Sequence, residues 1–152
     1  MWERLRRFSK LDGASRGVFL RAATLLPVIS ASVHVRGFRK TQLSLQRHAS
    51  VRSAPADNAL AAARLIARMV RAAVRSGLGR PTCLEESLAL WWLLARRGIA
   101  SELRVGVRKC GEKMEAHAWV ECEGDALNEP DDVHENFAAF DAALCSIRTE
   151  RP

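Results

Sequence analysis

Apolar residues in the second half of the chain first recur at helical spacing and then alternate with polar residues. Residues 83–97 are apolar around most of the helical circumference, so they predict a central helix that is buried on several sides, with Glu85 on its narrow polar side. Residues 102–108 alternate between charged and apolar, which predicts a half-buried strand. A glycine-containing turn at 109–113 leads to a second predicted strand at 116–121, and a third follows at 126–128. A buried helix backed by an antiparallel meander is an α+β arrangement.

Residues 14–35 form a mostly apolar stretch that Arg21 and Pro27 interrupt. The stretch falls short of the roughly 18 uninterrupted apolar residues that a membrane-spanning helix needs. Because proline disrupts a helix, we expect a pair of helices bent at Pro27 that lie against the core of the main domain. Peripheral membrane contact through residues 14–46 is the alternative, since the basic flanks suit anionic lipid. Residues 37–46 predict another short basic helix.

A further helix is predicted over residues 57–76, with Asp57 as its N-cap and Gly77 as its stop. Its arginines share one face, which is either a solvated surface or a site for an acidic segment of a partner: Arg64, Arg68, Arg71 and Arg75. Residues 49–56 contain serines and a proline and are interpreted as a connector. We therefore divide the chain into an N-terminal helical extension, 1–52, and a main domain, 53–152.

Net charge is concentrated in the N-terminal extension. Residues 1–52 contain eleven lysines and arginines and two acids, a net charge of +9, whereas the remainder has a net charge of −2. This asymmetry points to an acidic partner or an anionic membrane surface. Nucleic acid is not expected as a partner, because the extension has no series of aromatic residues for stacking and no recognisable binding motif.

The length and cysteine pattern narrow the class of protein. A chain of 152 residues fits one domain and can bury a core without disulfides or metal. The four cysteines form no Cys-x-x-Cys pair and have no histidines at zinc spacing, so we expect no metal site and no cofactor. Free thiols and the lack of a secretory signal favour a cytoplasmic protein, with membrane association as the alternative.

Cys83 and His117 are the residues with the clearest chemistry. Cys83 opens the predicted central helix, where the positive end of the helix dipole favours the thiolate, which is the nucleophilic form. His117 lies on the second predicted strand, from which an imidazole can take the proton of the thiol. Taken separately, each residue also fits a buried structural role. Taken together on these elements, they indicate a cysteine nucleophile and its base.

Several motifs carry a resemblance to a known family. They are Thr82-Cys83-Leu84, the helix 87–94, Arg97-Gly98-Ile99, the strand 103–109, Ala116-His117-Ala118-Trp119-Val120-Glu121 and Leu127-Asn128-Glu129. Over about residues 57–141 the chain resembles the transglutaminase-like leader peptidases of lasso-peptide biosynthesis. The resemblance implies a papain-like core, with the cysteine-bearing helix packed on a small antiparallel sheet. It also implies a cysteine protease that removes the leader region of a precursor peptide.

The same resemblance implies partners and catalytic residues. The partners are the precursor peptide, a leader-recognition protein and a separate lasso cyclase. Cys83 would be the nucleophile and His117 the general base and acid. The third catalytic residue would be Glu129 or Asn128, of which we favour Glu129. The remaining histidines and cysteines considered are expected to take no part in catalysis: His48, His134, Cys110, Cys122 and Cys145.

Three other functions fit part of the sequence. A true transglutaminase would use the same site but pass the acyl group to an amine. A non-catalytic module would use the fold only to bind a peptide or a partner. A basic adaptor for membrane or nucleic acid would be explained by the N-terminal extension alone.

Overall fold

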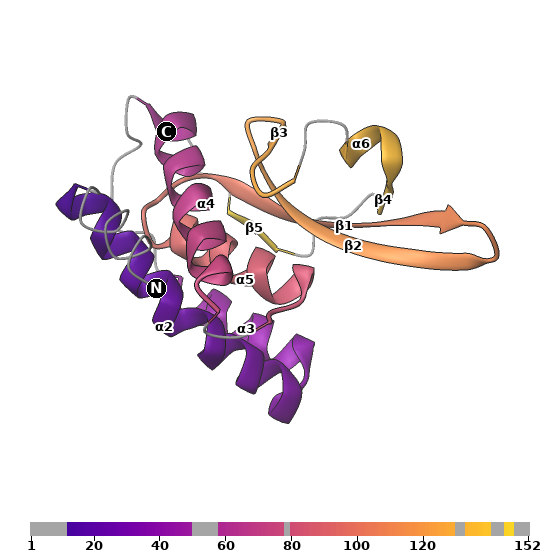
Figure 1. The fold of residues 1–152 in the computed structure, drawn as a ribbon, viewed down its shortest axis with the longest axis horizontal. Coiled ribbons are helices and arrows are strands. Elements are labelled where there is room, and N and C mark those ends of the chain that lie inside the picture. The colour runs from indigo at the N-terminus through magenta and orange to yellow at the C-terminus, as the bar shows by residue number, and fades with distance from the viewer. Residues whose placement is uncertain (1–11, 50–57, 78–79, 130–132, 141–144, 148–152) are drawn as a thin grey trace.

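The computed structural model describes residues 12–49, 58–77, 80–129, 133–140 and 145–147 (Figure 1). The helices are α2 (Gly13–Arg36), α3 (Phe38–His48), α4 (Ala59–Arg75), α5 (Cys83–Ala95) and the short α6 (Val133–Asn136). The strands are β1 (Ser101–Cys110), β2 (Lys113–Cys122), β3 (Asp125–Ala126), β4 (Ala138–Ala139) and β5 (Cys145–Ile147). Long helices thus precede an antiparallel sheet, and the predicted α+β class is confirmed.

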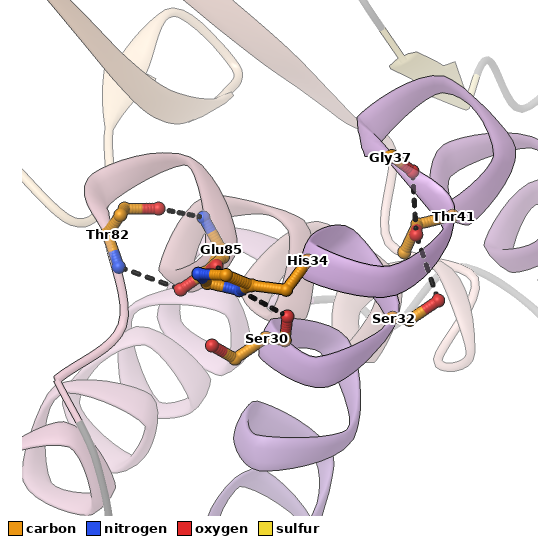
Figure 2. Close-up of polar contacts among 7 residues, drawn as sticks. All are labelled: Ser30, Ser32, His34, Gly37, Thr41, Thr82 and Glu85. Carbon is orange, nitrogen blue, oxygen red and sulfur yellow. Dashed lines mark hydrogen bonds and ion pairs between the residues drawn. The ribbon is translucent and has the colours of Figure 1, made fainter.

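Helix α2 runs without a break through Pro27, so the expectation of two helices bent at that residue is wrong. An internal proline removes one backbone hydrogen bond, and packing on both sides of Pro27 compensates for this loss. The buried apolar residues of α2 share one side of the helix, before and after the proline: Val18, Ala22, Leu26 and Ile29. At the corner to α3, the hydroxyls of Ser32 and Thr41 form a hydrogen bond of 2.9 Å (Figure 2). Helix α3 confirms the predicted basic helix.

Helix α4 confirms the predicted helix, and it ends just before Gly77, whose φ of 83° is in the left-handed region that favours glycine. The N-cap of α4 is Asn58, so the prediction of Asp57 at that position is wrong. Asp57 itself and the connector residues 50–56 lie outside the described residues.

The arginine stripe of α4 is exposed, but part of it binds this chain. Arg64 Nη2 lies 2.6 Å from Oδ2 of Asp125 on β3. Arg71 donates a hydrogen bond to the backbone carbonyl of Asn128. The stripe therefore helps to hold the segment after β2 against α4, and is not simply a solvated surface.

Helix α5 lies at the centre of the molecule, with α2, α4 and the sheet packed around it (Figure 1). The following α5 residues are at most 1% exposed: Leu88, Ala89, Leu90, Trp91, Leu94 and Ala95. The apolar pattern of 83–97 therefore predicted a buried helix correctly. The same pattern placed Glu85 on the polar side of the helix, and this is wrong, because Glu85 is 2% exposed.

Strands β1 and β2 form a long antiparallel hairpin in which Gly106 lies opposite His117. The sheet order is β3-β2-β1-β4, and β5 also pairs with β1. A side chain at Gly106 would meet Cη2 of Trp119 at 2.8 Å and the carbonyl oxygen of Ala138 at 3.0 Å. Glycine is therefore required where Trp119 and β4 approach β1. The sequence did not predict β4 and β5, since such short strands show no clear alternation.

Candidate active site

Cys83 is the first residue of α5, and Thr82 is the N-cap. The hydroxyl of Thr82 accepts a hydrogen bond from the amide of Glu85 at 3.3 Å. In return, the amide of Thr82 donates to Oε2 of Glu85 at 2.9 Å, which completes a capping box. The Cys83 thiol is half-buried and is not part of a disulfide. The cap fixes the backbone on both sides of this thiol.

Helix α2 contacts this cap from the other side. Figure 2 shows the imidazole of His34 against the carboxylate of Glu85, with Nδ1 lying 3.6 Å from Oε1. The same Nδ1 lies 2.8 Å from the carbonyl of Ser30, and it carries the hydrogen of that contact because a carbonyl only accepts. The N-terminal helices therefore support the turn that carries Cys83.

His117 lies on β2 and faces Glu129, which follows β3. Nε2 of His117 is 2.9 Å from Oε1 of Glu129, and the two side chains are 23% and 26% exposed. The two atoms are close but are not aligned as a hydrogen bond, so the contact is an ion pair whenever the imidazole is protonated. Because Nε2 faces the carboxylate, Nδ1 is the nitrogen left to exchange a proton with a nucleophile.

Asn128 makes a different set of contacts from its neighbour Glu129. Its Oδ1 accepts a hydrogen bond from the amide of Val120 at 2.8 Å, and its Nδ2 donates to the hydroxyl of Ser87 at 3.0 Å. The side chain is buried, with 2% exposure. Asn128 therefore joins α5, β2 and the segment after β3, while the structure brings Glu129 to the imidazole.

The contacts of two other α5 residues indicate the direction in which the Cys83 face of this helix is turned. Glu86 and Ser87 follow Cys83 by three and four positions, so they share its face of the helix. The hydroxyl of Ser87 donates to the carbonyl of Ala118, the neighbour of His117, at 2.9 Å. Burial raises the pKa of the Glu86 carboxyl, Arg71 opposes this shift, and the nearby Glu129 carboxylate adds to it. The face with Cys83 is thus directed toward the His117–Glu129 pair.

The Cys83 thiol and the His117 imidazole form no hydrogen bond with each other in this structure. Within the described part of the chain, Cys83 Sγ makes no hydrogen bond. Hydrogen bonds between catalytic groups are often long in the absence of substrate and shorten when substrate binds. Of the residues predicted from sequence, the structure therefore pairs His117 with Glu129, and Cys83 lies on the face of α5 that is directed toward them.

An open cleft of about 550 Å³ lies beside the imidazole. Its lining comes from the β1–β2 hairpin, the segment after β3, and α6: Arg108, Glu115, Ala116, His117, Glu129, Val133, Asn136 and Phe137. Phe137 stacks on the imidazole with ring centroids 5.2 Å apart, and the Arg108 guanidinium lies 4.7 Å from the Phe137 ring. The sequence did not identify Phe137, Arg108 or Glu86 as part of this region, because no local pattern links them to His117.

The other histidines and cysteines lie elsewhere, where they are described. His48 is exposed, and Cys110 is exposed at the end of β1. Cys122 is buried, and this burial raises the pKa of its thiol to about 11. The side chains of His134 and Cys145 lie outside the description. Among the described residues, no cluster of three or more histidine, cysteine, aspartate or glutamate side chains can hold a metal ion.

Comparison with known proteins identifies the family of this chain. Residues 25–140 match the family described as the transglutaminase-like superfamily, and this range includes Cys83, His117 and Glu129. The chain belongs to the transglutaminase-like superfamily. Transglutaminase-like proteins are usually cysteine-dependent enzymes. No curated protein and no solved structure matches the chain.

The transglutaminase-like match also bears on the N-terminal helices. It begins at residue 25, inside α2, and thus includes part of the extension assigned to residues 1–52. Residues of α2 and α5 belong to the same hydrophobic core. The transglutaminase-like fold of this chain is therefore built together with its N-terminal helices.

Proposed function

We propose that the chain is a cysteine peptidase that removes the leader from a ribosomally synthesised lasso precursor peptide, before a separate cyclase closes the macrolactam. Membership of the transglutaminase-like superfamily is consistent with either cysteine protease or acyl-transfer chemistry. The contact of His117 with Glu129, beside the helix that begins at Cys83, is the observation that carries the catalytic assignment. The resemblance of the sequence motifs to leader peptidases supplies the substrate.

In the first step, Nδ1 of His117 takes the proton of the Cys83 thiol. The thiolate attacks the carbonyl carbon at the junction of leader and core, and the carbonyl oxygen becomes an oxyanion. Glu129 stabilises the imidazolium that forms, since its carboxylate lies 2.9 Å from Nε2.

The backbone amide of Cys83 is the first donor to the oxyanion. The first amides of a helix have no partner within the helix. The amides of Thr82 and Glu85 are used by the capping box, and the amide of Glu86 bonds to the carbonyl of Thr82. The amide of Cys83 is not used by this cap and lies next to the attacking sulfur.

In the second step, the carbon–nitrogen bond breaks and His117 gives its proton to the leaving amine, which is the new N-terminus of the core peptide. The leader stays on Cys83 as a thioester. His117 then takes a proton from water, and the hydroxide attacks the thioester carbonyl. The carbon–sulfur bond breaks, the leader leaves with a free carboxylate, and His117 returns the proton to the thiolate.

The test is mass spectrometry of a matched precursor peptide incubated with the protein, with and without its leader-recognition protein. We expect a single cut at the leader–core junction, faster when the leader is presented, and no cut by Cys83→Ala. Cys110→Ala is the matched control and should cut like the wild type, because Cys110 is exposed at the last position of β1. Equal cutting by wild type and Cys83→Ala would refute the assignment. A precursor that is bound but never cut would favour the non-catalytic binding module.

Acyl transfer to an amine is the second candidate for the same site. Cys83 is only half-buried, so water can reach a thioester on its sulfur, and this favours hydrolysis. We therefore expect an added primary amine to leave the leader as a free carboxylate. An amide between leader and amine as the main product would instead identify a transglutaminase.

A further inference from the structure

Helix α2 has apolar side chains on its buried side and also on its exposed side. Its 24 residues are long and apolar enough to cross a membrane by length and composition, yet only 22% of its most apolar window is buried. The buried side packs against α4 and α5. The opposite side is therefore an apolar helix face that the described part of the chain leaves open.

The open face consists of residues spaced three and four apart, which we call the α2 stripe: Leu20, Thr24, Pro27, Val28, Ala31 and Val35. Its larger apolar side chains are strongly exposed: Leu20 at 55%, Val28 at 64% and Val35 at 84%. Thr24, the polar member, donates its hydroxyl to the backbone carbonyls of Leu20 and Arg21 at 3.1 and 3.0 Å. Because that hydroxyl is satisfied within the helix, the stripe can leave water at little cost.

Every charged residue within α2 and α3 is a cation. Residues 13–49 contain no aspartate or glutamate and six cations: Arg16, Arg21, Arg36, Arg39, Lys40 and Arg47. Further cations come from the turn after α5. A groove of about 710 Å³ between α2, α4 and α5 has a mostly apolar lining, and its charged lining residues are Arg21, Arg96 and Arg97. Trp92 lines the same groove, with the Arg96 guanidinium 5.5 Å from the ring.

We propose that the α2 stripe docks on the surface of an anionic lipid bilayer, with α2 lying in the plane of the membrane. The apolar stripe matches the acyl region and the flanking cations match the phosphates, as in interfacial helices. The groove likewise combines apolar side chains with arginines, and its Trp92 is of a residue type that is enriched at the membrane–water interface. Crossing of the bilayer is disfavoured, because Val18, Ala22 and Ile29 are buried in the protein core.

The test is co-sedimentation of the full chain with vesicles, either of phosphatidylcholine alone or of equal parts phosphatidylcholine and phosphatidylglycerol. The wild type should sediment with the anionic vesicles and stay in solution with the neutral ones, and added salt should release it. The double variant Leu20→Glu, Val28→Glu should lose about tenfold or more in vesicle affinity. Met114→Glu is the matched control, because Met114 is a 66% exposed apolar residue on β2, and it should bind like the wild type.

Thermal unfolding followed by circular dichroism checks that each variant is folded. If the double variant is unfolded, Arg21→Gln with Arg97→Gln takes its place and should weaken binding several-fold, since both arginines are exposed. Failure of the wild type to sediment with anionic vesicles at low salt would overturn the proposal. So would equal binding by the wild type and a folded stripe variant. Binding to polyglutamate without binding to vesicles would also overturn it and would assign the stripe to an acidic protein.

Discussion

Two adjacent residues, Asn128 and Glu129, divide two tasks between them. The amide of Asn128 is buried and bonds to Ser87 and Val120, whereas the carboxylate of Glu129 is partly exposed and faces His117. The contacts of Asn128 stabilise the fold beside the site, and the carboxylate of Glu129 acts on the imidazole. Substitution of each residue should therefore affect a different measurement.

Glu129→Gln should lower kcat for precursor cleavage about 10- to 100-fold and leave KM nearly unchanged. The loss arises because the neutral amide stabilises the imidazolium less well than the carboxylate does. Initial rates over a range of precursor concentrations provide the test. Glu112→Gln, at an exposed residue of the hairpin turn, is the matched control. An unchanged kcat for Glu129→Gln would remove Glu129 from the catalytic residues.

Asn128→Ala should lower the free energy of unfolding by about 1–3 kcal/mol, because it leaves the buried amide of Val120 without an acceptor. Urea unfolding at equilibrium measures this loss. Glu129→Gln should leave the unfolding free energy almost unchanged in the same experiment. If Asn128→Ala kept full stability and lost activity, Asn128 would instead be the residue that orients the imidazole.

Glu86 gives a prediction that depends on pH. Its pKa is raised above the usual 4.5, chiefly by burial. The fold therefore disfavours the charged form, and this cost appears only as the pH rises above the unfolded value. Glu86→Gln should stabilise the protein at about pH 7 by less than about 1 kcal/mol, and the gain should disappear near pH 4. Thermal unfolding at both pH values is the measurement, and an equal gain at both would contradict the argument.

At the scale of elements, the first turn of α5 has the most defined local structure near the site. Thr82 and Glu85, which form the capping box, flank Cys83 and Leu84, and His34 of α2 lies against Glu85. Glu85 therefore acts as a positioning residue for the nucleophile, through the backbone that it caps.

Glu85→Ala should lower the free energy of unfolding by about 1–2 kcal/mol, since the Thr82 amide loses its acceptor. Glu85→Gln should retain most of the stability, because glutamine also completes a capping box. Urea unfolding of the two variants, with precursor cleavage in parallel, gives the comparison. If both variants lost the same stability, the charge of Glu85 would matter more than its cap.

The sequence predicted the elements whose pattern extends over several turns or residue pairs. The central helix and the β1–β2 hairpin were confirmed, as was the basic helix after Gly37. Local pattern failed at Pro27, where tertiary packing keeps the helix continuous, and at Glu85, where capping buries a charged side chain. The sequence identified Cys83, His117 and Glu129 as site residues. It did not identify Phe137, because the contact of Phe137 with the imidazole depends on the fold of α6 and on the pairing of β4 with β1.

At the scale of the whole molecule, the N-terminal helices and the strand-rich region surround one core. Val18, Ala22, Leu26 and Ile29 of α2 belong to the same buried cluster as the apolar residues of α5. In Figure 1 the α2–α3 pair lies at one end of the molecule, and the β1–β2 hairpin extends from the other. Docking through the α2 stripe would therefore leave the cleft beside His117 accessible.

Ile29→Ala should lower the free energy of unfolding by about 2–4 kcal/mol, because Ile29 is 1% exposed and its truncation leaves a cavity. Its neighbour provides the control: Val28 is 64% exposed, and Val28→Ala should change stability by less than about 0.5 kcal/mol. Urea unfolding of the full chain tests both. A small effect of Ile29→Ala would mean that α2 is an appendage and not part of the core.

The most direct test of the central claim is the mass of the covalent intermediate. The protein is mixed with precursor peptide and leader-recognition protein, quenched rapidly in acid to preserve the thioester, and examined by intact mass and peptide mapping. Our account predicts a species heavier than the protein by the leader less one water, with the addition located on Cys83. A leader joined to any other residue, or cleavage by Cys83→Ala at the wild-type rate, would contradict it.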